Sequence, residues 1–126
     1  MTKASGESAA LIWCPFPDRE SARSIAGALL DEGLVACANI IGEVESLFIW
    51  QGARDSACET GVLFKTTAAR LDAAVSRLGR LHPYDTPAIL GWRADAVWPA
   101  TSAWLGAITQ PETQSGVAAA KTGGKE

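Results

Sequence analysis

Four apolar runs in this chain lack the polar alternation that strands with one face in water normally show. A sheet covered on one face only has strands in which apolar and polar side chains alternate. The runs are Leu-Ile-Trp-Cys at 11–14, Val-Ala-Cys-Ala at 35–38, Phe-Ile-Trp at 48–50 and Ile-Leu-Gly-Trp at 89–92. They therefore predict strands that are covered on both faces. The chain has 126 residues, of which 48% are apolar, enough for one domain with a full core.

Between the first two runs the spacing of apolar residues predicts a helix. Asp18 suits the N-cap position, and Glu20 places a negative charge in the first turn. Apolar residues then follow at helical spacing, at positions 22, 25, 26, 29 and 30. Gly33 suits the residue after the helix, where a left-handed conformation is common.

The rest of the domain reads as a long hairpin, a second helix, a fourth strand and a terminal helix. We expect one strand over residues 34–50, bent or bulged at Gly42, then a turn at 51–55 and a strand over 58–66. Thr67 can cap a helix that ends near Leu81, followed by a strand over 88–93 and a helix over 98–108. The first strand covers residues 9–14. The order β-α-β-β-α-β predicts an α+β, ferredoxin-like antiparallel sheet with an extra C-terminal helix.

Two helices cover only one face of such a sheet, so the other apolar face needs a second cover. One alternative is the terminal helix, but about ten residues extend only ~15 Å. The other is a further copy of the chain, which we favour because the domain has no other element to spare. Trp50 and Tyr84 are the expected interface residues.

Composition and charge exclude several classes of partner. The net charge is −3 and no basic patch is visible, so nucleic acid is not an expected partner. No segment has the length of a membrane span or of a signal-peptide core. Residues 1–8 and 109–126 are small or polar, and we expect them to be a disordered terminus and a flexible tail around a domain at 9–108.

The three cysteines are Cys14, Cys37 and Cys58, an odd number without CxxC spacing. This pattern argues against a disulfide framework and against a structural zinc site. We therefore expect a soluble protein of a reducing compartment, the cytoplasm. Cys37 lies in an apolar run and is expected to be a small buried hydrophobe, whereas Cys58 is expected near the surface.

The segment His-Pro-Tyr-Asp-Thr-Pro at 82–87 contains the only histidine and the only tyrosine of the chain. Residues before proline favour extended conformations, so the segment is a stiff connector between the second helix and the fourth strand. It is either a rigid turn with no chemistry, or a support for the only imidazole, a good ligand for transition metals.

Taken together, several motifs give the chain its resemblance to the CutA family of divalent-cation tolerance proteins. The motifs are Val-Ala-Cys-Ala-Asn-Ile at 35–40, Ser-Leu-Phe-Ile-Trp-Gln-Gly at 46–52, Glu59, Lys-Thr at 65–66, the 82–87 segment, and Trp-Leu at 104–105. They cover about residues 9–108. The resemblance implies a ferredoxin-like subunit in a homotrimer whose sheets face inward, as in PII-type signalling proteins.

The resemblance also implies a role in copper or other divalent-metal tolerance. It places metal ligands at Cys14 and His82, while Leu81 stands where the family pattern has a second histidine. Thiolate and imidazole suit copper, and Glu59 and Asp85 are further candidate ligands from the same or a neighbouring subunit. Otherwise Cys14 is a buried thiol and His82 a surface residue.

Two other functions remain in view. One is a PII-like module that binds a small ligand or a protein between subunits without a physiological metal. Lys65, Arg93 and Glu59 would serve it, although a pair between Lys65 and Glu59 is slightly favoured, since their spacing puts both on one face of a strand. The other is an enzyme, which we do not expect, since Pro-Phe-Pro at 15–17 offers no phosphate-binding loop and no Ser/His/Asp grouping is visible.

Overall fold

The computed structural model describes residues 8–109. Its elements follow the predicted order: β1 (Ala9–Phe16), α1 (Arg19–Asp31), β2 (Cys37–Trp50), β3 (Ala53–Thr67), α2 (Ala68–Leu81), β4 (Leu90–Arg93) and α3 (Pro99–Ile108). The ferredoxin-like α+β fold is thus confirmed. The two expected loose ends lie outside the described residues except for Ser8 and Thr109. Each of these is hydrogen-bonded to the domain, Ser8 to Ala68 and Thr109 to Leu105.

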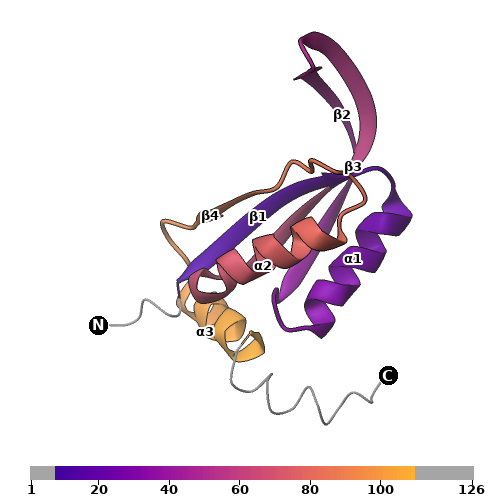
Figure 1. Ribbon diagram of the computed structural model, residues 1–126. Coiled ribbons are helices and arrows are strands. Elements are labelled where there is room, and N and C mark those ends of the chain that lie inside the picture. Colours follow the sequence, from indigo (N-terminus) through magenta and orange to yellow (C-terminus); the bar gives the residue numbers. More distant parts are fainter. Residues whose placement is uncertain (1–7, 110–126) are drawn as a thin grey trace.

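One four-stranded antiparallel sheet carries the structure, in the order β2-β3-β1-β4. Helices α1 and α2 lie on one face of this sheet (Figure 1). The core between these layers is apolar and includes the fully buried side chains of Ile12, Phe16, Leu29, Phe64 and Leu78. Burial of such side chains contributes roughly 1.5–3 kcal/mol each and is the main force holding the helices on the sheet.

Helix α1 begins and ends where the local sequence predicts. The Asp18 carboxylate accepts a hydrogen bond from the Ser21 backbone N–H at 2.8 Å, which caps the helix. At the other end Gly33 has a φ of 71°, and the N–H of Leu34 bonds to the carbonyl of Leu29. This is a Schellman ending, and it turns Leu34 into the core. The second strand consequently begins at Cys37 and not at residue 34, which corrects the predicted boundary.

The hairpin of β2 and β3 is longer than predicted. The expected turn at 51–55 and the strand start at residue 58 are wrong, because Gln51 and Gly52 alone form the turn and β3 begins at Ala53. Both turn residues have positive φ, 51° and 82°. Turns with that backbone match the twist of paired strands, so two residues suffice. The predicted bulge is confirmed: the register shifts between Ile40 and Gly42.

Two smaller boundaries and one capping contact also differ from the prediction. Strand β4 begins at Leu90 and not at residue 88, and α3 begins at Pro99, where proline is favoured in a first turn. Thr67 occupies the N-cap position of α2, but its hydroxyl makes no capping bond. That hydroxyl lies 3.4 Å from the hydroxyl of Thr109 and so links β3 to the end of α3.

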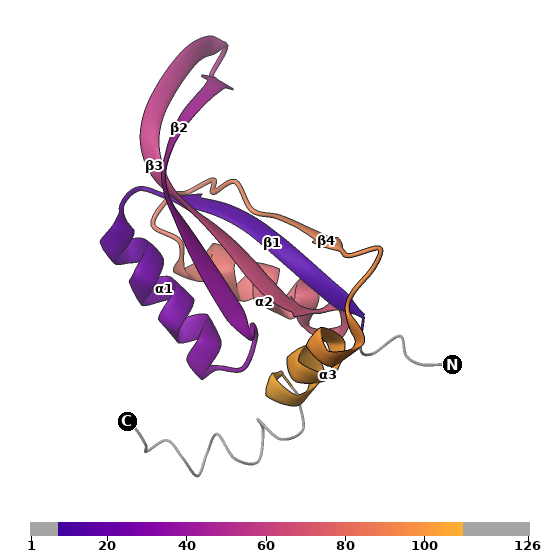
Figure 2. The ribbon, with the colours of Figure 1, turned by 180° about the vertical axis from the view of Figure 1, so that it is seen from behind.

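The second face of the sheet is largely uncovered. Helix α3 lies at one end of the sheet, and the view from behind shows the strands in front with no helix across them (Figure 2). Leu90 is 64% exposed and Trp92 46% exposed on this face. We call the face formed by Leu11, Trp13, Leu63, Leu90 and Trp92 the open face, following the pairing register of β1, β3 and β4.

Beyond the bulge the hairpin leaves the body of the domain. Residues 43–60, here called the hairpin arm, project from the sheet end as a curved two-stranded ribbon (Figure 1). Four large apolar side chains of the arm are exposed: Leu47, Phe48, Ile49 and Trp50. Within residues 8–109, no helix combines the length and the apolar character needed to span a membrane.

Candidate functional site

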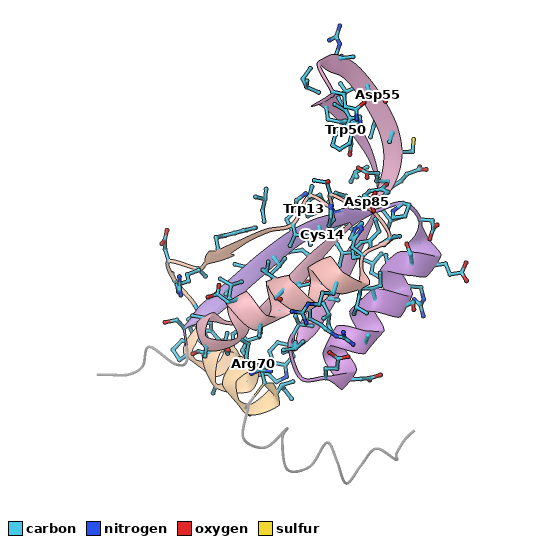
Figure 3. The ribbon with its side chains drawn as sticks, viewed as in Figure 1. Trp13, Cys14, Trp50, Asp55, Arg70 and Asp85 are labelled. Atoms are coloured by element: carbon cyan, nitrogen blue, oxygen red, sulfur yellow. The ribbon has the colours of Figure 1, made fainter. Side chains whose placement is uncertain are left out.

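The candidate site lies where β1 ends and the arm begins. Cys14 is on the helix-covered side of β1, and the 82–87 connector returns past this end of the sheet on its way from α2 to β4. Figure 3 shows Cys14 and Asp85 near the base of the hairpin arm. The fold therefore brings the first strand and the connector together, as the metal hypothesis requires.

The Cys14 side chain is fully buried. Burial raises the pKa of its thiol to about 12, and the negative charge of Glu59 adds to the rise. The thiol donates a weak hydrogen bond to the carbonyl of Pro15, with Sγ at 3.5 Å. At neutral pH Cys14 is therefore a protonated thiol, and a metal has to displace its proton to bind.

Both ring nitrogens of His82 are engaged in hydrogen bonds. Nδ1 accepts the backbone N–H of Tyr84 at 3.1 Å, and Nε2 lies 2.9 Å from the carbonyl oxygen of Pro15. Because a carbonyl only accepts, Nε2 carries the proton and the imidazole is the neutral Nε2–H tautomer. His82 is 7% exposed, and its ring stacks on Phe16 with centroids 4.7 Å apart. The expectation of a surface histidine does not hold.

Tyr84 connects the 82–87 connector to Glu59 at the base of the hairpin arm. The Tyr84 hydroxyl donates to Glu59 Oε2 at 2.9 Å, and Glu59 as a residue is 9% exposed. Burial raises the pKa of Tyr84 to about 12, with further contributions from the hydrogen bond to Glu59 and from its charge. The hydrogen-bond partner of Glu59 is thus Tyr84 and not Lys65, the partner considered from the sequence.

The remaining predicted residues take other positions. Leu81 packs against the core, and Asp85 is exposed. Cys37 is half-buried and opposite Lys65 in the strand register, with Sγ 3.6 Å from Asn39 Oδ1. Cys37 is thus less buried than predicted, because the strand face that carries it is open.

A shallow cleft of about 350 Å³ adjoins Glu59 at the start of α1. Its walls come from the cap of that helix and from both strands of the hairpin near the bulge. The lining residues are Pro17, Asp18, Arg19, Gly42, Glu43, Cys58, Glu59 and Thr60. Carboxylates outnumber the single cationic side chain of Arg19, so the cleft is suited to a small polar or cationic group.

Sequence reasoning missed the contacts that organise this site. The imidazole of His82 bonds to a carbonyl 67 positions earlier, and Tyr84 bonds to Glu59 25 positions earlier. The signal available beforehand was the proline on each side of the short segment, which indicates a connector of fixed course.

Comparison with known proteins identifies the family. The family model described as CutA1 divalent ion tolerance protein matches residues 10–107. The chain belongs to the CutA1 family. Two curated CutA1-family relatives bear the description divalent-cation tolerance protein CutA. The one from Thermococcus kodakarensis is 32% identical over 100 residues, covering 79% of this chain and 95% of the relative. The one from Escherichia coli is 34% identical over 88 residues, covering 70% and 79%.

Solved CutA structures share the fold. CutA from Xylella fastidiosa aligns with a TM-score of 0.78 at 31% identity, covering 82% of this chain and 99% of that one. CutA1 from Pyrococcus horikoshii aligns with a TM-score of 0.75 at 34% identity, covering 80% and 98%. The ferredoxin-like architecture and the CutA resemblance predicted from the sequence are both confirmed.

The donor atoms at the β1 end are of types that suit copper. A thiol and an imidazole both reach one carbonyl oxygen, that of Pro15, and such soft and borderline donors suit copper ions. Within residues 8–109 no cluster of three or more His, Cys, Asp or Glu side chains is arranged to hold a metal. Copper binding by this pair would therefore exchange existing hydrogen bonds for metal bonds.

Proposed function

We propose that this CutA1-family chain acts in tolerance of divalent metal ions as a homotrimer, assembled through the hairpin arm and the open face. The observation that carries this proposal is the arm itself. Leu47 and Ile49 are 69% and 70% exposed on a ribbon that leaves the domain. A two-stranded hairpin alone is at best marginally stable in water, so a cover for these side chains is needed.

A second copy of the chain is the most economical cover. The open face adds Leu90 and Trp92 to the exposed apolar surface, and large contiguous apolar surfaces mark interaction sites. In a cyclic assembly each subunit supplies one arm and receives one, so every apolar arm and every open face is covered. Three copies is the number that the CutA resemblance implies.

Light scattering coupled to gel filtration tests the assembly. We expect the parent to have three times the mass of one chain at micromolar concentration. Ile49→Asp on the arm should shift the mass toward the monomer, because a buried unpaired charge is costly. Leu30→Asp is the matched control, since Leu30 is 41% exposed on α1 and away from the arm. A monomeric parent would contradict the proposal.

For the metal itself, we propose copper held by Cys14 and His82. The supporting observation is their shared approach to the Pro15 carbonyl. Titration with Cu(I) under anaerobic conditions should give saturable binding that is weakened roughly tenfold or more in Cys14→Ser and in His82→Ala. Cys58→Ser is the control, since Cys58 is an exposed thiol outside this pair. Equal binding by all three variants would remove Cys14 and His82 from the site.

The alternative is a PII-like module that binds a small ligand or a protein without a physiological metal. The cleft beside Glu59 favours it, because it joins α1 to the base of the arm. A thermal-shift screen against nucleotides, small anions and small amines separates the two functions. Stabilisation by one of these compounds, lost in Glu43→Gln, would support the alternative.

Neither function requires catalysis, and we propose that the chain is not an enzyme. We also propose the cytoplasm as its compartment. Cys14, Cys37 and Cys58 are all free thiols, as is usual in a reducing compartment. Cell fractionation with an antibody to the chain tests the location.

A further inference from the structure

His82 uses both ring nitrogens to fasten the connector to the rest of the domain. Nε2–H donates to the carbonyl of Pro15 at 2.9 Å, and Nδ1 accepts the N–H of Tyr84 at 3.1 Å. The stack on Phe16 and the 7% exposure keep the ring in this orientation. No lone pair of the imidazole is therefore free for a metal.

A metal can bind His82 in two ways, and both break the same bond. If the metal takes Nδ1, the lone pair that accepts the Tyr84 N–H is used directly. If the metal takes Nε2, the proton of the neutral ring moves to Nδ1, because only one nitrogen carries it. Nδ1–H then faces the N–H of Tyr84, and two donors cannot bond. In either case the Tyr84 N–H loses its acceptor.

Tyr84 transmits this change to the base of the hairpin arm. Its hydroxyl donates to the carboxylate of Glu59, a buried residue, at 2.9 Å. Glu59 is paired with Val44 in the strand register, just beyond the bulge at Gly42. It also lines the cleft at the start of α1. The rings of His82 and Tyr84 are also in contact, with centroids 5.0 Å apart, so a change at the imidazole reaches the ring of Tyr84 directly.

We infer that His82, Tyr84 and Glu59 form a metal-sensitive latch. With metal absent, the latch fastens the connector to β3 and holds Glu59. Metal binding at His82 releases the backbone N–H of Tyr84, loosens the Tyr84–Glu59 hydrogen bond and frees the Glu59 carboxylate toward the cleft. This inference rests on the proposed copper contact at His82, and it adds a signal from that contact to the base of the arm.

The single tyrosine of the chain makes the latch directly observable. Selective ¹⁵N-tyrosine labelling of the full-length protein gives one amide signal, that of Tyr84. Cu(I) is diamagnetic, so the signal can be followed through an anaerobic titration. We expect it to shift in step with copper occupancy, and its hydrogen exchange to become roughly fivefold faster or more, as loss of one backbone hydrogen bond implies.

A pair of variants tests the latch without metal. His82→Ala removes the acceptor, so Tyr84 in the metal-free variant should already exchange rapidly. His82→Asn places an amide oxygen near the Nδ1 position and should keep the slow exchange. Circular dichroism establishes that both variants are folded. Similar exchange in folded Ala and Asn variants would show that His82 does not hold Tyr84.

The outcomes separate this inference from the copper proposal. Copper binding that depends on Cys14 and His82 but leaves the Tyr84 amide unchanged overturns the latch and leaves the copper site standing. Absence of copper binding overturns the site and the metal trigger together. A shifted Tyr84 amide in the parent, with no copper response in His82→Ala, supports both.

Discussion

The indole of Trp13 lies over Gly61, its diagonal neighbour on the open face of the sheet. Gly61 pairs with Pro15 in the register of β1 and β3, and the Trp13 ring occupies the space that a side chain at position 61 would need. This glycine is therefore required by a close approach of an aromatic ring. The contact places the Trp13 ring against β3, in the surface that we propose for assembly.

Gly61→Ala should destabilise the domain by about 1–3 kcal/mol, since the new methyl group collides with the ring and overpacking costs are of this size. Chemical denaturation measures the change. The matched control is Gly27→Ala, where a Cβ meets nothing within 4 Å and alanine favours the helix. In a Trp13→Leu background the penalty at position 61 should shrink. An unchanged penalty would mean that the indole is not its cause.

The cap of α1 makes stability depend on pH at the acid end. The backbone and side-chain hydrogen bonds from Ser21 lower the pKa of Asp18 in the folded state. The ionised Asp18 side chain therefore stabilises the folded state. This stabilisation is fully present above the ordinary carboxyl pKa of about 3.9 and is lost as pH falls through the lower pKa of the folded state. Asp18→Asn keeps a capping oxygen but cannot titrate. Melting curves between pH 2 and 6 should show a shallower acid decline for this variant, and parallel curves would contradict the assignment.

The sequence predicted those parts of the fold that have local signals. Asp18 and Gly33 delimit α1 in the sequence as in the structure, because capping depends on neighbouring residues. The outer half of β3 was missed because residues 54–56 are charged or polar and resemble a loop. Their strand conformation comes from pairing with β2 across the two-residue turn, which the residue types of β3 taken alone do not reveal.

In the candidate site, too, the sequence predicted the features with a local signal and missed those that depend on the tertiary arrangement. The cysteine and the histidine were found because their residue types and the stiff connector are visible in the sequence. Their environment was not, because it depends on β1 lying between β3 and β4 in the sheet. That order places the Pro15 carbonyl beside His82 and Glu59 beside Tyr84, and so turns an expected surface histidine into a buried one.

Thiol labelling should rank the three cysteines by their surroundings. Cys58 is exposed, Cys37 is half-buried and Cys14 is buried with a pKa raised to about 12. The thiolate is the reactive form, so Cys14 should stay unmodified even at pH 9, while Cys58 reacts at once. Iodoacetamide treatment followed by peptide mass spectrometry measures this order. Labelling of Cys14 as fast as Cys58 would show that the β1 end opens readily.

The bulge at Gly42 sets the direction in which the hairpin arm leaves the sheet. Gly42 has a φ of 111°, a conformation that residues with a Cβ rarely adopt, and a Cβ there would meet nothing within 4 Å. Gly42→Ala therefore tests backbone strain without a steric clash, in contrast to Gly61→Ala. We expect a loss of about 1–3 kcal/mol, the usual cost of a strained backbone position.

Gly42→Ala should also weaken the proposed assembly, because the bulge sets the direction of the hairpin arm. If the bulge straightens to relieve the strain, the exposed side chains of Ile49 and Trp50 change direction relative to the open face. Under the proposed assembly, the trimer of Gly42→Ala should then dissociate at a higher protein concentration than that of the parent. Gly106→Ala in α3 is the control, since it also meets no atom within 4 Å and has no positive φ. Unchanged stability and assembly in Gly42→Ala would show that the bulge accepts an ordinary residue and does not aim the arm.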